Sequence, residues 1–493
     1  MQKKKAIIIG AGIAGIASAI RLRSLGIAVE VYEQNTYPGG KLSQMSLGGY
    51  RFDCGPSLFT MPQFVEELFE LSGKKAEEHF LYLKKDVVCN YFYNDGVKFT
   101  AFADKEKFAK EASLVFKDET ASVIRYFQRS QLKYNLTASL FLEKSLHKVS
   151  TYLSMDTLKS ILQLQKLNVN TTLNDYNERS FKDPKLIQLF NRFATYNGSS
   201  PYKTPGIMSM IPHLEQHFGT FFPKGGMHAI TQSLYDLAVD LGVKFHFSAF
   251  VEEILTQKNK AYGIIVDNQA VNADIIISNM DIVPTYRKLL QKHKAPEKIL
   301  QQERSSSALI FYWGIKKQFP ELDLHNIFFA KDYKKEFEAI FENNAISNDP
   351  TVYVNITSKH ETADAPPGSE NWFVMVNAPG DTGQDWDEIV AETKENIISK
   401  LNRILKVDMK SLIEHEAILN PATIESTTQS YQGSLYGAAS NDKFAAFIRH
   451  PNFSKKVKHL YFCGGSVHPG GGIPLCLLSA KIATDIIKKD YKL

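Results

Sequence analysis

Three glycines near the start of the chain have a spacing that suits phosphate binding. Gly10, Gly12 and Gly15 stand in the segment Gly-Ala-Gly-Ile-Ala-Gly, which also contains Ala11 and Ile13. Glycines at these positions allow a tight turn and let a pyrophosphate approach the backbone closely. If a helix follows, its first N–H groups carry a partial positive charge that favours phosphate. The chemistry expected here is therefore dinucleotide binding.

The elements around these glycines have the order that this chemistry needs. The apolar run 6–9 is typical of a strand buried in a parallel sheet, and a helical pattern follows it and ends at Gly26. The run 28–32 predicts a second strand that ends at Glu33, where a carboxylate would accept hydrogen bonds from a ribose. A GxGxxG spacing alone is weak evidence. The complete βαβ unit favours dinucleotide binding over glycines that serve only helix–sheet packing.

The residues after Glu33 decide between the two common dinucleotides. An NAD-binding domain would be expected to continue with another helix and strand. Instead, a second glycine turn with a basic side chain follows at 39–41, and a further glycine-rich stretch follows at 49–57. This arrangement resembles the N-terminal stretch of the family of FAD-dependent amine oxidases, protoporphyrinogen oxidases and carotenoid desaturases. The resemblance implies FAD and not NAD.

Segments further along the chain extend the resemblance. The backbone of Val251 matches the family's contact with adenine, Asn279 ends a strand above the cofactor, and Leu435 lies in a segment that passes close to the flavin. The strand 459–463 and the glycine-rich loop 464–474 strongly resemble the C-terminal signature of bacterial-type phytoene desaturases. A helix is expected at 475–488, and its N-terminal donors would stabilise the anion of a reduced flavin.

The resemblance spans essentially the whole chain and implies a set of cofactor-binding residues. They are Gly10, Ala11, Gly12, Ile13, Gly15, Glu33, Gly40, Lys41, Gly55, Pro56, Ser57, Leu58, Val251, Asn279, Leu435, Gly464, Gly470, Gly471, Gly472, Ile473 and Pro474. One departure is that many relatives carry an acidic residue in the turn after the last strand. Here the turn reads Gly-Gly-Ser at 464–466, so a ribityl hydroxyl would be bound by the backbone or by a hydroxyl group.

The expected fold is α/β, with a Rossmann-like FAD-binding domain, a mixed α+β substrate domain and a helical insertion. The FAD-binding domain would be discontinuous, made of 1–75, 221–290 and 445–493. The range 76–220 predicts a mainly helical insertion because apolar residues recur there at helical spacing, and 291–444 predicts a mixed-sheet substrate domain.

The composition of the chain indicates which kinds of partner and which cellular locations can be expected. The net charge is only +5, and no cluster of Lys and Arg accompanies a nucleic-acid-binding motif, so nucleic acid is not an expected partner. The four cysteines stand far apart without a CxxC pair or a zinc-site spacing, which argues against a disulfide scaffold and a structural metal site. No run of about 18 apolar residues predicts a membrane span, and no signal peptide is recognised. We expect a cytoplasmic protein that associates peripherally with membranes.

The resemblance implies an FAD-dependent desaturase that introduces a C=C bond into a long apolar carotenoid. The stretch 55–62 is closest to the branch that acts at the 3,4-bond of hydroxylated or monocyclic carotenoids. Phytoene desaturase, carotenoid cis–trans isomerase and amine-type oxidase are the alternative enzymes, and a flavin-binding membrane module without catalysis is an alternative of another class. A second GxGxxG unit for a nicotinamide is absent, so oxygen or a membrane quinone is the expected electron acceptor.

No catalytic side chain can be assigned from the sequence, since FAD would accept the hydride. His468 lies beside the flavin by resemblance, but a loop residue that holds a turn is an equal interpretation. Asp53, Arg192 and Glu425 are weaker candidates for the proton acceptor.

A segment of the predicted insertion has the composition of an interfacial helix. Between 121 and 167, apolar side chains are interleaved with lysines, which suits a helix lying at an anionic membrane surface. An ordinary helix that packs its apolar stripe on the core is the alternative. The residues concerned are Leu140, Phe141, Leu142, Leu146, Tyr152, Leu153, Leu158, Ile161 and Leu162, with Lys144, Lys148, Lys159 and Lys166.

Overall fold

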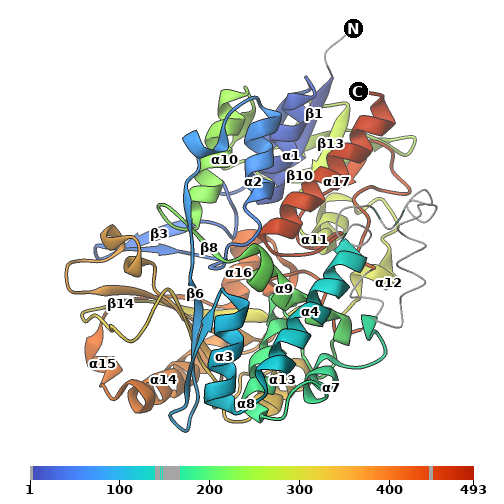
Figure 1. Ribbon diagram of the computed structural model, residues 1–493. Coiled ribbons are helices and arrows are strands. Elements are labelled where there is room, and N and C mark those ends of the chain that lie inside the picture. The colour runs from blue at the N-terminus through green and yellow to red at the C-terminus, as the bar shows by residue number, and fades with distance from the viewer. Residues whose placement is uncertain (1–3, 139–144, 146, 148–166, 443–447) are drawn as a thin grey trace.

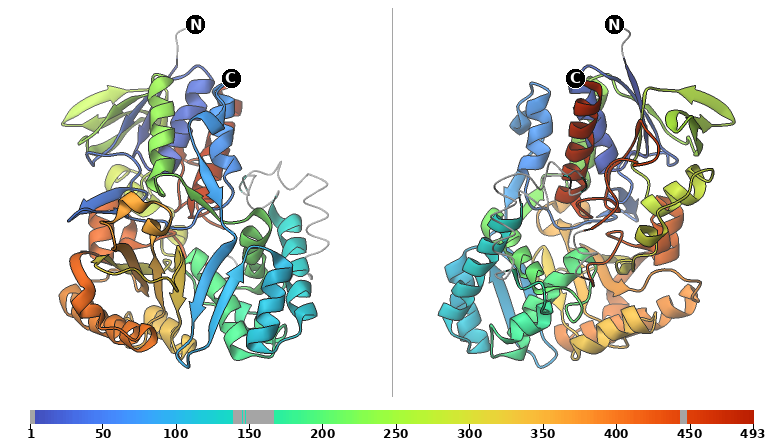
Figure 2. Two further views of the ribbon diagram at one scale, coloured as in Figure 1. Left: turned by 60° about the vertical axis from the view of Figure 1, so that its left-hand side comes forward. Right: turned by 90° about the vertical axis from the view of Figure 1, so that its right-hand side faces the viewer.

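The structure is a computed structural model that describes residues 4–138, 145, 147, 167–442 and 448–493. The chain forms two lobes, with both termini at the end of the upper lobe in Figure 1. The first strand, the helix after it and the C-terminal helix lie together in that lobe, although they come from opposite ends of the sequence (Figures 1 and 2).

The upper lobe is built on a five-stranded parallel sheet of order β19-β13-β1-β2-β9. Its strands are β1 (Lys5–Ile9), β2 (Ala28–Tyr32), β9 (Lys244–His246), β13 (Ile275–Ser278) and β19 (Leu460–Phe462). Ile8 packs into the core on one face of the sheet and Ile7 into the core on the other. The continuous apolar run in β1 exists because both faces are covered.

Helices cover one face of this sheet and a small antiparallel sheet covers the other. The helices are α1 (Ile13–Ser24), α2 (Gln63–Leu71), α10 (His228–Asp240) and α17 (Ile473–Tyr491). The small sheet consists of β10 (Val251–Gln257), β11 (Lys260–Val266) and β12 (Gln269–Asn272). The predicted βαβ unit is confirmed, and the predicted C-terminal helix begins two residues earlier than expected.

The lower lobe is built on a seven-stranded mixed sheet of order β18-β14-β17-β16-β15-β6-β7. Its strands are β6 (Val87–Phe92), β7 (Lys98–Phe102), β14 (Ser307–Ile315), β15 (His325–Phe328), β16 (Val352–Asn355), β17 (Glu370–Ala378) and β18 (Ile413–Leu419). Helix α14 (Trp386–Leu405) packs on one face. The hairpin of β3 (Gln44–Leu47) and β4 (Tyr50–Asp53) packs on the other face.

The range 76–220 is helical in most of its described part but not throughout. It contributes β6 and β7 to the seven-stranded sheet, and β5 (Tyr82–Lys84) pairs with β8 (Phe221–Pro223). Its longer helices are α3 (Lys105–Phe116), α4 (Thr120–Thr137), α7 (Leu173–Glu178) and α8 (Pro184–Asn191). The residues predicted to form the interfacial helix beyond 138 lie outside the described residues, except for 145, 147 and 167.

The remaining α-helices of the described chain have three to ten residues, and α13 and α16 contribute residues to the wall of the cavity described below. They are α9 (Ile211–His213), α11 (Ile282–Pro284), α12 (Glu297–Leu300), α13 (Tyr333–Glu342), α15 (Met409–Leu412) and α16 (Pro421–Thr428). Among the described helices, none combines the length and the apolar character that crossing a bilayer requires.

Candidate active site

A cavity of about 760 Å³ lies where the two lobes meet. In the upper lobe, its wall comes from the turns that follow β1, β2, β13 and β19. These turns lie at the carboxyl ends of parallel strands, which is the edge where open α/β sheets bind their ligands. In the lower lobe, its wall comes from one face of the seven-stranded sheet.

All but three of the predicted cofactor-binding residues line this cavity. Those that line it are Gly10, Gly12, Ile13, Glu33, Gly40, Lys41, Gly55, Pro56, Ser57, Leu58, Val251, Asn279, Leu435, Gly464, Gly471, Gly472, Ile473 and Pro474. The structure thus brings together residues from both ends of the chain and from three segments between them.

The three exceptions, Ala11, Gly15 and Gly470, lie behind the wall and have structural contacts. The Ala11 N–H donates to Oε2 of Glu33 at 2.7 Å, which orients this buried carboxylate. A Cβ at Gly15 would lie 2.2 Å from the Gly10 carbonyl oxygen, so this glycine is needed for close packing of helix and strand. Gly470 has φ +140° and packs against the Arg449 guanidinium.

Asn279 joins the two glycine-rich loops. A Cβ at Gly12 would lie 2.6 Å from Asn279 Oδ1, and a Cβ at Gly464 would lie 2.7 Å from Asn279 Nδ2. The Nδ2 group also donates to the Cys463 carbonyl at 3.2 Å. Side chains at either glycine would push against Asn279, so the shape of the cavity here depends on both glycines.

Two helices begin at this wall, and a glycine directly precedes each of them. Gly12 precedes α1 and Gly472 precedes α17, and in the described structure neither helix has an acidic first turn or a side-chain cap. Their N-terminal N–H groups therefore keep their attraction for anionic groups. This donor set suits a dinucleotide whose phosphates lie at α1 and whose ring system lies toward α17, so the residues present fit FAD.

Lys41 connects the second glycine turn to a distant segment. Its Nζ donates to the carbonyl oxygens of Ser434 at 2.8 Å and Leu435 at 3.3 Å. Burial lowers the pKa of this amine to about 8.

In the turn 464–466, which lacks the acidic residue found in many relatives, the Ser466 hydroxyl accepts the Ile282 N–H at 2.9 Å. The Ser466 O–H remains able to donate, so a ribityl hydroxyl could be bound by this group as well as by the backbone of the turn.

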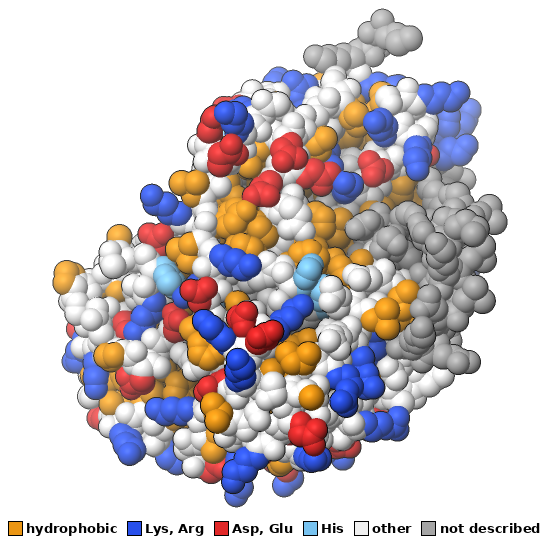
Figure 3. Space-filling model, viewed as in Figure 1, with side chains coloured by type: hydrophobic (Ala, Val, Ile, Leu, Met, Phe, Trp, Pro, Cys, Tyr) orange, Lys and Arg blue, Asp and Glu red, His pale blue; other side chains and the backbone are white. Residues whose placement is uncertain are grey.

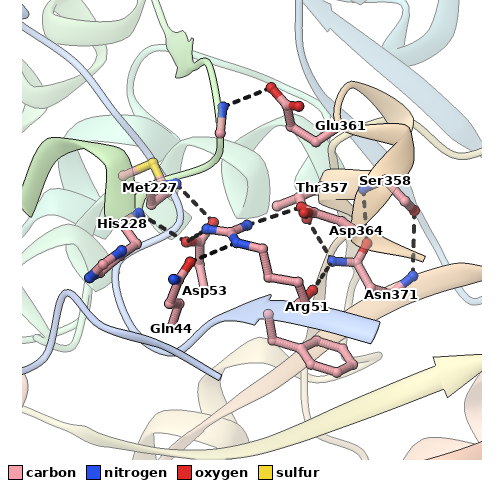
Figure 4. Close-up of polar contacts among 12 residues, drawn as sticks. Gln44, Arg51, Asp53, Met227, His228, Thr357, Ser358, Glu361, Asp364 and Asn371 are labelled. Carbon is pink, nitrogen blue, oxygen red and sulfur yellow. Dashed lines mark hydrogen bonds and ion pairs between the residues drawn. The ribbon is translucent and has the colours of Figure 1, made fainter. Parts of the chain in front are cut away.

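Three of the four residues considered as proton acceptors do not line the cavity. Asp53 holds the start of α10 by accepting the N–H groups of Met227 and His228 at 2.8 and 2.9 Å, and it pairs with Arg51 at 2.7 Å (Figure 4). His468 is buried, and its carbonyl oxygen accepts from two side chains. Glu425 also lies outside the lining, so only Arg192 faces the cavity.

A polar cluster in the lower-lobe wall was missed by the sequence analysis, except for Arg192. It consists of Arg192, Tyr196, Glu215, His325 and Tyr353, and all five line the cavity. Burial raises the pKa of Glu215 and lowers the pKa of His325 to about 3. These residues come from distant segments without a recurring spacing, so no local pattern could have identified them.

The described residues contain no group of His, Cys, Asp and Glu side chains suited to a metal ion.

Most of the chain matches a known family model. Residues 13–488 match the family described as flavin containing amine oxidoreductase. The chain is 58% identical over 484 residues to a 1-hydroxycarotenoid 3,4-desaturase from Flavobacterium sp. (strain P99-3), a match that covers 98% of this chain and 99% of the relative. It is 32% identical over 501 residues to a 4,4'-diapolycopene oxygenase from Methylomonas sp, covering 100% and 99% of the two chains.

A solved structure of a putrescine oxidase variant has the same fold. It superposes with a TM-score of 0.65 over 99% of both chains at 14% sequence identity. The expectation of an α/β fold with a Rossmann-like FAD-binding part is confirmed, and so is the expectation of FAD as the cofactor.

Proposed function

Because the chain belongs to the flavin-containing amine oxidoreductase family, we propose that it is an FAD-dependent carotenoid desaturase acting at the 3,4-position of a hydroxylated carotenoid. The 58% identity to a 1-hydroxycarotenoid 3,4-desaturase over nearly the full length of both chains supports this substrate and this bond. We further propose that the cofactor is held by the lining residues of the upper lobe, within the discontinuous domain 1–75, 221–290 and 445–493.

The observation that carries the proposal is a row of side chains across the floor of the cavity. Leu419, Ile310, Met375, Tyr353 and Ile327 are paired neighbours on five adjacent strands, β18, β14, β17, β16 and β15, and all line the cavity. Four steps between strands span roughly 19 Å. Apart from the Tyr353 hydroxyl, the side chains of this row are apolar, so the row suits a long apolar chain much better than a small amine.

In the proposed reaction, the cofactor and the protein have different tasks. FAD, when bound, supplies a hydride acceptor. The residues of this chain would hold the polyene along the row, and the meeting of the two lobes would exclude water from the reacting carbons. Oxygen or a quinone is the proposed electron acceptor, because the sequence has no second dinucleotide fingerprint for a nicotinamide.

A carotenoid is confined to the bilayer, so the proposal includes peripheral association with the membrane. The described helices provide no membrane span. On the face seen in Figure 3, basic and acidic side chains are interspersed over both lobes, which does not favour a polyanion such as nucleic acid. Apolar side chains are visible between the lobes on the same face (Figure 3).

Expression in cells that make different carotenoids tests the proposed function. The pigments are separated by chromatography and identified by mass. We expect a loss of two mass units and an extended chromophore from cells that supply a 1-hydroxycarotenoid. Desaturation of phytoene alone would assign the chain to phytoene desaturation, an unchanged mass with altered retention would indicate isomerisation, and a mass gain of oxygen would indicate an oxygenase.

A further inference from the structure

The polar cluster lies at one end of the apolar row. His325 stands two residues before Ile327 on β15, so both side chains point to the same face of the sheet. Tyr353, on the neighbouring strand, belongs to both the row and the cluster. A long apolar molecule on this floor would therefore meet buried polar groups at the β15 end.

One part of the cluster is an ion pair enclosed by aromatic rings. Arg192 Nη2 lies 3.5 Å from Glu215 Oε1, and the Tyr196 hydroxyl donates to the same oxygen. The guanidinium lies over the rings of Tyr91 and Phe193, at 5.4 and 4.7 Å from their centroids. The side chains of Arg192 and Glu215 are only 11% and 3% exposed, so this pair is held within the wall.

The other part of the cluster, His325 and Tyr353, connects it to Ser57 in the predicted cofactor-binding stretch 55–58. His325 Nδ1 lies 2.7 Å from the Tyr353 hydroxyl, and that hydroxyl donates to Ser57 Oγ at 2.8 Å. Ser57 lines the cavity and is one of the cofactor-binding residues that the family resemblance implies. The β15 end of the row is therefore also the end near the proposed reaction centre.

Two nitrogens of the cluster lack a hydrogen-bonding partner among the described residues. They are His325 Nε2 and Arg192 Nε, and both are buried. His325 is only 3% exposed. A hydrocarbon substrate would leave both nitrogens unsatisfied, and buried polar groups without partners are unfavourable. A hydroxyl group can donate and accept, so it can pair with Nε2 of His325 in either tautomer.

We propose that His325 binds the hydroxyl group at the end of the carotenoid and so determines substrate and bond specificity. The inference rests on the proposed function. In a 1-hydroxycarotenoid, the hydroxyl is only a few bonds from carbons 3 and 4. Anchoring the oxygen at His325 therefore fixes which bond lies at the flavin side of the cavity. Tyr353 acts as a positioning residue, because its hydroxyl orients the imidazole.

The test compares a 1-hydroxycarotenoid with the same carotenoid lacking the hydroxyl, using purified holoenzyme and substrates in liposomes. We expect the wild-type kcat/KM to favour the hydroxylated substrate by at least about tenfold, the discrimination typical of one buried hydrogen bond. A wild-type ratio near one overturns the inference, whatever the variants do. Absence of desaturation of either substrate by FAD-loaded wild type overturns the proposed function and the inference with it.

Two variants test the residues themselves. His325→Phe keeps a ring of similar shape and removes Nε2, so the preference for the hydroxylated substrate should fall at least about tenfold. Tyr353→Phe should lower the preference less, because the imidazole remains. His293, which lies outside the cavity lining and bonds Thr256 at 2.9 Å, provides the control His293→Phe, which should keep the wild-type ratio.

FAD content and melting temperature are measured for every variant, so a failure to fold is recognised. If His325→Phe and Tyr353→Phe both retain FAD and the wild-type substrate ratio, His325 does not bind the hydroxyl. If His325→Phe does not fold, the wild-type ratio and the Tyr353→Phe ratio decide the question.

Discussion

At the scale of single residues, the cofactor site depends on glycines, because the absence of a side chain leaves room for the cofactor. Gly12→Val would place a branched side chain where a Cβ alone would lie 2.6 Å from Asn279 Oδ1. It would also fill the space that a pyrophosphate needs at the start of α1. We expect the purified variant to lose its FAD, measured as flavin absorbance per mole of protein after acid release.

The matched control for this glycine is Gly73→Ala. Gly73 stands after α2, where an added Cβ meets nothing within 4 Å, and it is not part of the cavity lining. Despite some backbone strain at its positive φ, this variant should retain FAD. Full flavin occupancy in Gly12→Val would refute the assignment of this loop to the pyrophosphate.

The glycines could be predicted from the sequence because their meaning is local. Gly10, Gly12 and Glu33 fall within one βαβ unit, whose spacing is fixed by the geometry of two strands and a helix. The polar cluster could not be predicted in the same way. Arg192, Glu215 and His325 are brought together only by the arrangement of a helical segment against the seven-stranded sheet, and tertiary packing leaves no periodic trace in a single sequence.

At the scale of elements, Asp53 and Arg51 together connect three parts of the fold, namely β4, α10 and the turn 362–364. The Asp53 carboxylate binds Arg51 on β4 and the first N–H groups of α10, and Arg51 also pairs with Asp364 at 3.0 Å in the turn 362–364 (Figure 4). Asp53→Asn removes the charge and leaves Arg51 with a poorer partner. Since the carboxylate is buried and the guanidinium is partly exposed, we expect the free energy of unfolding to fall by about 3 kcal/mol.

Denaturant unfolding of the holoenzyme measures this change. Gln44→Ala is the control, because Gln44 Oε1 accepts from Arg51 Nε at 2.8 Å at the exposed end of the same network. It should cost no more than about 1 kcal/mol. An Asp53→Asn variant that keeps its stability but loses only turnover would return Asp53 to the list of candidate proton acceptors.

Elements were predicted best where both faces of a strand or one stripe of a helix are buried. Within the predicted mixed-sheet domain 291–444, the apolar run 308–314 lies in β14 and the amphipathic run 386–404 lies in α14. The joining of β6 and β7 to the sheet that contains β15 was not predicted. These strands come more than 200 residues earlier in the chain, and pairing across such a distance is set by packing and not by local pattern.

At the scale of the whole molecule, the proposed substrate requires contact with a bilayer. The candidate segment contains Lys144, Lys148, Lys159 and Lys166, which lie outside the described residues, so the sequence alone supports it. Each surface lysine would add about 1 kcal/mol of attraction to anionic lipid. Replacing all four by Glu should weaken flotation with anionic liposomes and slow turnover of liposome-borne carotenoid, while FAD content stays unchanged.

Neutral liposomes provide the control for that measurement, since charge reversal should affect binding to them much less. If flotation and turnover on anionic liposomes are unchanged, the membrane contact lies elsewhere on the protein. The apolar side chains visible between the two lobes in Figure 3 would then be the next region to alter.

Acid sensitivity is a further property of the whole molecule, because histidines are buried as neutral groups in several parts of the fold. Burial lowers the pKa of His325 to about 3 and the pKa of His213 and His450 to about 4. In the unfolded chain, the pKa of each of these imidazoles is about 6.5. The folded state therefore binds fewer protons than the unfolded state below this pH, and the stabilisation present above pH 6.5 is lost as the pH falls.

We expect the free energy of unfolding to decrease between pH 6.5 and 5 by up to about 1.4 kcal/mol per pH unit for each of these histidines. Denaturant unfolding at several pH values in this range measures the slope, above the region where most carboxylates titrate. Replacing His450 by Gln should cost stability at pH 7.5, because the bond between its Nδ1 and the Pro451 carbonyl, 2.8 Å long, is lost. The same variant should show a shallower slope, since one titrating group is gone. A slope near zero in the wild type would contradict the prediction that these imidazoles are buried as neutral groups.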